Sequence, residues 1–187
     1  MTATSTILPD TRSLEFMIEN PKIEVSAHRV CALAGDLIAT CRTLCLATAH
    51  DDGPWAAPVY YVTGPSGFCF FSSPDSRHIK EALAAKRAAG SIYAESDSWE
   101  NLRGLQMAGT VAAVRAGPRA AAILTAYLAR FPFVKNMAGV SGRMGPADFF
   151  NLFRVKLYMF RPETILYMDN GIAFGFRQSI SPKDLLP

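Results

Sequence analysis

Apolar residues recur with a helical period before about residue 40 of this chain, and in short strand-like runs after it. Between Ser26 and about Thr40 the apolar positions share one face of a helix. These positions are Val30, Leu33, Leu37 and Ile38. We therefore expect an amphipathic helix here, with Ser26 as its N-cap, because a serine hydroxyl can accept a hydrogen bond from the first turn.

Three short apolar runs follow, at 43–49, 54–62 and 67–73, and the turn sequences HDDG and GPSG separate them. Runs of this length joined by tight turns predict an antiparallel meander. Pro58 lies inside the second run and has no N–H to donate to a neighbouring strand. We therefore expect that strand to be irregular or unpaired on one side at Pro58, where a ligand could meet the backbone.

The rest of the chain predicts further helices and strands around a glycine-rich loop. In chain order these are a helix from Pro74 to about Lys86, strands at 90–96 and 102–116, a helix opened by Gly117 and Pro118, the loop at 134–148, and strands at 153–162, 164–169 and 172–176. Gly104 and Gly109 are expected to mark bulges or close backbone approach. This order of elements predicts an α+β domain built on an antiparallel sheet that closes into a small barrel.

Length and composition indicate one globular domain. The 187 residues are 50% hydrophobic and 19% charged, which is typical of a chain that buries a substantial core. Residues 1–25 are expected to form an N-terminal arm, because the first 22 are polar and irregular. A single domain is expected over 26–187.

The distribution of charge and apolar residues argues against two kinds of partner. The formal net charge is +3, and no basic run of the kind found in nucleic-acid or membrane-surface binders is present. No stretch approaches the roughly 18 consecutive apolar residues that a membrane span requires. The first residues lack a basic start followed by an apolar run, so no secretory signal is expected.

The cysteines, at positions 31, 41, 45 and 69, show neither a disulfide-framework spacing nor the paired C-x-x-C spacing of structural zinc sites. Reduced thiols in the cytoplasm are therefore expected. Ligation of zinc by His28, Cys31, Cys41 and Cys45 is the alternative, but we expect no metal, because unpaired cysteines are commonly buried as small hydrophobes.

The stretch SSPDSRHIKEAL has the composition of an anion-binding helix start. With Ser73 as N-cap and Pro74 at the first helical position, the first turn offers unpaired N–H groups and the positive end of the helix dipole. Arg77 adds a planar fork suited to phosphate, and Ser72 or Ser73 adds a hydroxyl. The alternative is an ordinary surface ion pair between Arg77 and Glu81, four residues apart on the helix.

Trp99, Arg103 and Gln106 form a second group of candidates around the start of the 102–116 strand. Alternation places Gln106 on the face opposite to Arg103. A glutamine in an apolar strand needs polar partners, and a flat heteroaromatic ligand could supply them. A solvent-facing glutamine is the alternative. The motifs of nucleophilic hydrolases and zinc peptidases are absent, and we name no catalytic side chain.

Five stretches of this chain, taken together, resemble the pyridoxamine 5′-phosphate oxidase-like, FMN-binding split-barrel superfamily, and within it a small bacterial branch. They are TLCLATAHDDGPWAAPVYYV, FCFFSSPDSRHIKEAL, LRGLQMAGTV, YLARFP and ILYMDNGIAFGFR. Their order and spacing carry the resemblance, which covers about residues 40–178.

The resemblance implies an antiparallel six-stranded split β-barrel with flanking helices, which forms a homodimer and binds FMN at the subunit interface. The FMN phosphate is expected near Ser72, Ser73, Arg77 and His78, and the isoalloxazine ring along the backbone of Pro58, Val59 and Tyr60. Gln106, with Arg103 and Trp99, is expected to complete the site from the partner subunit.

The function implied is that of an FMN-dependent oxidoreductase acting on a small organic molecule, with the flavin as the reacting group. The chain ends in FRQSISPKDLLP, without the Arg-x-His-Arg-like substrate signature of pyridoxamine-phosphate oxidases proper. That departure argues against the vitamin B6 reaction itself. The alternative is a non-catalytic protein that uses the same barrel to hold FMN, heme or another planar ligand.

Overall fold

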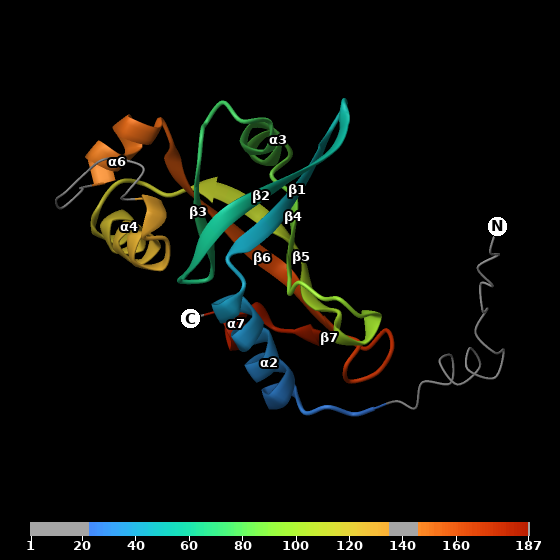
Figure 1. Ribbon diagram of the computed structural model, residues 1–187. Coiled ribbons are helices and arrows are strands. Elements are labelled where there is room, and N and C mark those ends of the chain that lie inside the picture. The colour runs from blue at the N-terminus through green and yellow to red at the C-terminus, as the bar shows by residue number, and fades with distance from the viewer. Residues whose placement is uncertain (1–22, 135–145, 187) are drawn as a thin grey trace, which may run out of the picture.

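The computed structural model describes residues 23–134 and 146–186, and these residues form a barrel flanked by helices (Figure 1). The strands are β1 (Thr43–His50), β2 (Gly53–Gly64), β3 (Gly67–Ser72), β4 (Ala88–Tyr93), β5 (Arg103–Ala113), β6 (Lys156–Asp169) and β7 (Arg177–Ile180). Their order is β3-β2-β1-β4-β5-β6-β7, with every neighbouring pair antiparallel. A further antiparallel pairing between β3 and β6 closes the first six strands into a ring, and β7 extends the sheet beyond β6.

Helices close both ends of the barrel and cover part of its outside (Figure 1). They are α2 (Ala27–Thr40), α3 (Arg77–Ala85), the 3-10 turn η1 (Trp99–Asn101), α4 (Pro118–Arg130), α6 (Pro146–Phe153) and α7 (Pro182–Leu185). α3 lies at one end of the barrel, α2 and α7 lie at the other, and α4 and α6 lie together on one side. None of the helices in the described residues has the length and hydropathy needed to cross a bilayer.

Two apolar cores correspond to the inside and the outside of the barrel wall. The interior core joins inward side chains of the strands, such as Leu44, Tyr61 and Phe70, to α2 and α3. The second core joins α4 and α6 to the outer faces of β2, β3 and β6, and its strand residues include Val62 and Met159. Helices thus bury the outside of the wall over β3 and over the ends of β2 and β6 that pair with it.

The expected first helix and the meander are confirmed. α2 begins after Ser26, whose hydroxyl accepts a hydrogen bond from the Arg29 N–H. β1, β2 and β3 are joined by tight turns at the expected positions. β2 pairs with β3 only from Tyr61 onward, so Pro58 has β1 on one side and no paired strand on the other. The expectation drawn from Pro58 is therefore correct.

The predicted start of the next helix at Pro74 is wrong, because α3 begins at Arg77. The carbonyl of Ser73 accepts hydrogen bonds from both the N–H and the hydroxyl of Ser76, at 3.1 and 2.8 Å. The Ser73 hydroxyl in turn accepts from the Asp75 N–H. These bonds make a separate turn of residues 73–76, and the helix follows it.

The two strands predicted at 153–162 and 164–169 form one strand, β6, and residues up to Phe153 belong to α6. Pro162 lies opposite Gly109 and Thr164 lies opposite Ala108, so Glu163 is an extra residue that forms a bulge in β6. An added Cβ at Gly109 would lie 2.0 Å from the Arg161 carbonyl oxygen, so only glycine permits this approach. The close backbone approach expected at Gly109 is therefore confirmed, and with the bulge at Glu163 β6 continues past its proline.

The strand predicted at 172–176 is also wrong, because these residues form a turn and β7 follows at Arg177. The Asp169 carboxylate accepts from the Gly171 N–H, and the Asn170 amide oxygen accepts from the Gly175 N–H. These side chains hold the segment in a wide turn. The predicted N-terminal arm and most of the predicted 134–148 loop lie outside the described residues.

Candidate cofactor-binding site

The turn between β3 and α3 gathers hydroxyl groups around an imidazole. Ser72 Oγ lies 2.9 Å from His78 Nε2 and 3.1 Å from Ser76 Oγ. All three side chains are half-buried. Hydroxyls and a neutral imidazole can each donate a hydrogen bond to an oxyanion, so this cluster has the donor chemistry that a phosphate requires.

Burial favours the neutral form of the His78 imidazole. Burial lowers its pKa, and the nearby Glu81 carboxylate opposes this in part. A neutral imidazole can accept a hydrogen bond from one hydroxyl and donate one to another group, depending on its tautomer. The cluster is therefore polar without carrying its own positive charge.

Arg77 lies at the first position of α3 and its guanidinium is held by several groups. Its Nε donates to Glu81 Oε1 at 2.6 Å, and its Nη2 donates to the Gly53 carbonyl at 3.2 Å. The guanidinium carbon lies 4.7 Å from the centre of the Trp55 ring. Among the described residues Nη1 has no hydrogen-bond partner, so part of the fork is available to a ligand.

The ion pair between Arg77 and Glu81, which the sequence offered as an alternative, is present, but it is not an ordinary surface pair. Glu81 is only 6% exposed, and Thr48 Oγ1 donates to its second carboxylate oxygen at 2.5 Å. These hydrogen bonds, with that from Thr48 as the largest cause, lower the pKa of Glu81. The pair therefore holds Arg77 in place through Glu81 and Thr48 of β1. It leaves Nη1 of Arg77 able to contact a ligand.

Lys156 is a cation beside this turn that the sequence did not single out. It begins β6 and lies directly opposite Ser72 across the β3–β6 pairing. It makes no ion pair with another described residue. The position of Lys156 opposite Ser72 depends on the pairing of β3 with β6, which closes the barrel. These strands are distant in sequence, so a local sequence pattern could not predict it.

The first half of β2 has an open backbone edge next to the turn, since β3 pairs with β2 only from Tyr61 onward. Pro58 and Tyr60 point to the outside of the barrel, whereas the Val59 side chain is buried in the interior core. Only the backbone of Val59 can therefore contact a ligand from this side. The Tyr60 ring is 43% exposed and packs against Phe131 and Phe133, next to the end of α4.

Gln106 lies on the same outer face as Pro58. The register runs across four strands from Pro58 to Cys45, Ser91 and Gln106, and residues directly opposite one another share a face. Gln106 is exposed there. Within one chain the structure thus brings Gln106 and Pro58 to one surface, with β1 and β4 between them.

Arg103 and Trp99 lie apart from Gln106 within one chain. Arg103 has the orientation of the inward-facing Leu105, and its charge acts on Cys41 and Tyr167 near the α2 end of the barrel. Trp99 packs edge-on against Phe174, with 5.5 Å between ring centroids. The Asn170 amide donates to the Trp99 carbonyl at 2.8 Å and holds η1 against the following turn.

The closed six-stranded ring, with its open β2 edge and capping helices, defines a split-barrel protein. The family model described as pyridoxamine 5'-phosphate oxidase matches residues 33–152, which is more than half of the chain. The chain therefore belongs to the pyridoxamine 5'-phosphate oxidase family. No curated protein matches the chain.

Solved structures with the same fold include proteins named for different planar ligands. The heme binding protein from Mycobacterium smegmatis is 19% identical, with a TM-score of 0.63 over 87% of this chain and 61% of its own. HutZ, the heme storage protein from Vibrio cholerae, is 16% identical, with a TM-score of 0.55 over 68% of this chain and 86% of its own.

An FAD-binding protein from Mesorhizobium loti is 13% identical, with a TM-score of 0.54 over 75% of this chain and 92% of its own. At identities this low the likeness establishes the fold alone. The chain also spans less than two thirds of the mycobacterial protein.

Proposed function

We propose that this protein is an FMN-binding flavoprotein that catalyses oxidation or reduction of a small organic molecule. The observation that carries the proposal is the cluster of Ser72, Ser76 and His78 beside the braced Arg77, at the open edge of β2. Hydroxyl, imidazole and guanidinium donors suit a phosphate, and a free strand edge suits the polar rim of a flat ring.

In this proposal Ser72, Ser73, Arg77 and His78 hold the phosphate. The ring lies against the backbone of Pro58–Tyr60. A bound flavin supplies the electron or hydride transfer, and the protein supplies binding, orientation and exclusion of water. We name no protein side chain as a catalytic acid or base.

The proposal includes a homodimer in which the partner subunit contributes Gln106, Arg103 and Trp99. Support comes from the outer face of β2, β1, β4 and β5, where four alanines lie in one row across the strands: Ala56, Ala47, Ala89 and Ala108. Three of the four are exposed. A face of small side chains allows two sheets to approach closely. A cytoplasmic location is also part of the proposal.

The absorbance spectrum of the purified protein, followed by titration with FMN and with riboflavin, tests the cofactor. We expect a bound flavin, or uptake of FMN with an affinity at least tenfold above that of riboflavin, which lacks the phosphate. A protein that neither contains flavin nor takes up FMN would contradict the proposal.

A second candidate is a non-catalytic protein that stores or carries heme or another planar ligand. Two of the solved structures with this fold are named for heme binding or heme storage, which favours this alternative. Titration with hemin should then give a Soret band at one equivalent per chain. For the flavoprotein, we expect NADH or NADPH to reduce bound FMN faster than free FMN, with turnover of an acceptor.

A further inference from the structure

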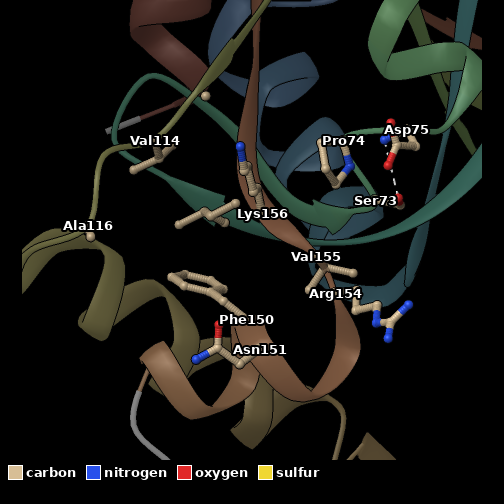
Figure 2. A pocket seen from close by; sticks show the side chains of 12 residues that line it. Ser73, Pro74, Asp75, Val114, Ala116, Phe150, Asn151, Arg154, Val155 and Lys156 are labelled. Atoms are coloured by element: carbon tan, nitrogen blue, oxygen red, sulfur yellow. Dashed lines mark hydrogen bonds between the residues drawn. The ribbon is translucent and has the colours of Figure 1, made fainter.

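A cleft of about 680 Å³ lies beside the β3–α3 turn, on the side that faces α6 (Figure 2). Its walls come from the turn itself, the segment after β5, the end of α6 and the start of β6. The lining residues are Ser73, Pro74, Asp75, Ala113, Val114, Ala116, Phe150, Asn151, Arg154, Val155, Lys156 and Leu157. This volume is within the range of small-molecule sites.

One part of the cleft wall is apolar. Val114, Phe150 and Val155 are half-buried against the core that joins α4 and α6 to the barrel, and Leu157 belongs to that core. Figure 2 shows Phe150 and Val155 on one side of the cleft and Pro74 on the other. These surfaces can contact the carbon skeleton of a ligand.

The charge at the cleft is mainly positive. Lys156 lies between Val114 and the Ser73–Asp75 turn, and Arg154 lies at the rim (Figure 2). Neither forms an ion pair with another described residue. The acidic lining residue, Asp75, already lies 3.5 Å from Lys80. A ligand with a negatively charged group would give Lys156 and Arg154 the ion-pair partner that no described residue provides.

The cleft adjoins the proposed cofactor site but is not the same site. Ser73 lines the cleft and belongs to the proposed phosphate site as well, whereas Ser72, Arg77 and His78 do not line the cleft. No residue of β2 lines it either. A ligand in the cleft would therefore lie near the phosphate end of the proposed FMN and away from the ring.

We propose that this cleft binds a small organic anion with an apolar body, of the aryl or medium-chain carboxylate or sulfonate class. The apolar wall holds the body, and Lys156 with Arg154 holds the anionic group. Because the cleft lies away from the proposed ring position, the ligand acts as a second bound molecule and not as the reductant or oxidant of the flavin. The inference stands on the cleft itself and does not require that FMN binds.

The test uses two fluorescent probes of similar shape, the anionic 8-anilinonaphthalene-1-sulfonate and the neutral N-phenyl-1-naphthylamine. Both are titrated into the full chain with and without saturating FMN. We expect the anion to bind more tightly than the neutral probe and to remain bound when FMN is added.

Three variants locate the binding. Lys156→Gln and Arg154→Gln should each weaken binding of the anionic probe about fivefold, the upper end for a partly exposed charge pair. Neither variant should change the affinity for the neutral probe. Ala116→Trp should fill the cleft and weaken the binding of both probes. Lys183→Gln, which removes an exposed lysine of α7, is the matched control and should change neither. Thermal melts confirm that each variant is folded.

Equal affinity of the wild type and all three cleft variants for the anionic probe would overturn the proposal. Displacement of that probe by FMN, with no effect of Ala116→Trp, would also overturn it, because the probe would then occupy the cofactor site. If FMN fails to bind but the three variants behave as expected, the proposed flavin function fails and the anion cleft stands.

Discussion

The guanidinium of Arg77 is held in one position by a buried carboxylate, a backbone carbonyl and an aromatic ring. A fixed fork loses little conformational freedom when it binds a phosphate. We expect Arg77→Ala to weaken FMN binding by about 1–3 kcal/mol, the usual contribution of a charge-assisted hydrogen bond. Fluorescence titration measures the change.

The matched control for Arg77→Ala is Arg87→Ala, which removes an exposed arginine that pairs with Glu163 at 3.0 Å. This control should leave FMN affinity unchanged. Riboflavin affinity should not change in either variant, because riboflavin carries no phosphate. An unchanged FMN affinity in Arg77→Ala would remove this residue from the site.

Glu81 links the stability of the fold to pH. Hydrogen bonds from Thr48 and Arg77 lower its pKa from the ordinary value of 4.5. As pH falls, the unfolded chain therefore takes up this proton before the folded chain does. The stabilisation is complete above about pH 4.5 and is lost as pH falls through the lower folded-state value.

We expect Glu81→Gln to flatten the fall in unfolding free energy as pH drops below about 4.5, and urea unfolding at a series of acidic pH values measures it. Glu163→Gln, at an exposed position in an ion pair, should leave the slope as in the wild type. A Glu81→Gln slope equal to that of the wild type would show that this carboxylate has no part in the acid transition.

At the scale of elements, Arg130 at the end of α4 holds the end of α2. Its Nη2 donates to the carbonyls of Ile38 and Ala39, at 3.0 and 3.1 Å, and to that of Cys41. These carbonyls belong to the last turn and C-cap of α2, which lack helical partners and carry the negative end of the helix dipole. The guanidinium also lies 5.0 Å from the Tyr61 ring centroid.

We expect Arg130→Ala to lower the free energy of unfolding by about 1.5–3 kcal/mol, the range for hydrogen bonds that involve a charged group. Chemical denaturation measures this loss. Arg115→Ala, at an exposed position before α4, should cost much less. Similar losses in the two variants would mean that the capping contacts contribute little.

Two glycines give opposite predictions for the same substitution. Gly109→Ala should destabilise the protein by roughly 3 kcal/mol, because the added carbon meets the Arg161 backbone in a packed sheet. Gly35→Ala should stabilise it by roughly 0.5–1 kcal/mol, because Gly35 lies inside α2 with nothing within 4 Å of an added Cβ. Thermal melts compare both variants, and a neutral Gly109→Ala would contradict the close approach at the bulge.

The elements that were predicted correctly are those whose determinants are local. Apolar spacing and Ser26 fix α2, and tight turns fix the meander of β1 to β3. Two strands were predicted at 153–162 and 164–169 in place of β6, because the Gly109 that lies opposite Pro162 is distant in sequence. The start of α3 was predicted too early, at Pro74. The hydrogen bonds between Ser73 and Ser76 compete with helix formation there, and composition does not show them.

The residues of the candidate site also fall into two groups, those that the local sequence predicts and those that depend on contacts between distant strands. The residues of the β3–α3 turn are neighbours in sequence, so their gathering could be predicted from one stretch. Glu81 as a buried brace and Lys156 as an additional cation depend on contacts with β1 and β3, and only the closed barrel supplies these contacts. The assignment of Gln106 and Pro58 to one ligand rests on the resemblance, and the strand register adds only that both lie on one outer face of a chain.

At the scale of the whole molecule, the outer face of β2, β1, β4 and β5 predicts the assembly. Ala89 is exposed in the middle of this face, so Ala89→Arg should leave the monomer folded but prevent two sheets from approaching. We expect the wild type to sediment at about twice its chain mass of 20.3 kDa and Ala89→Arg to sediment as a monomer with weakened FMN binding.

Ala122→Arg, at an exposed position of α4, is the control for the assembly and should remain dimeric. A wild type that sediments at its chain mass would contradict the dimer. A monomeric Ala89→Arg that binds FMN as tightly as the wild type would contradict a cofactor shared between subunits.

The open half of β2 also has a consequence for solubility. A strand edge left unpaired is a template on which a second chain can extend the sheet, and such edges lead to aggregation. Pro54 and Pro58 lie along this half of β2, and neither can donate the hydrogen bond that an incoming strand would need. The gap in the barrel can therefore stay open to a small molecule while it remains closed to other polypeptides.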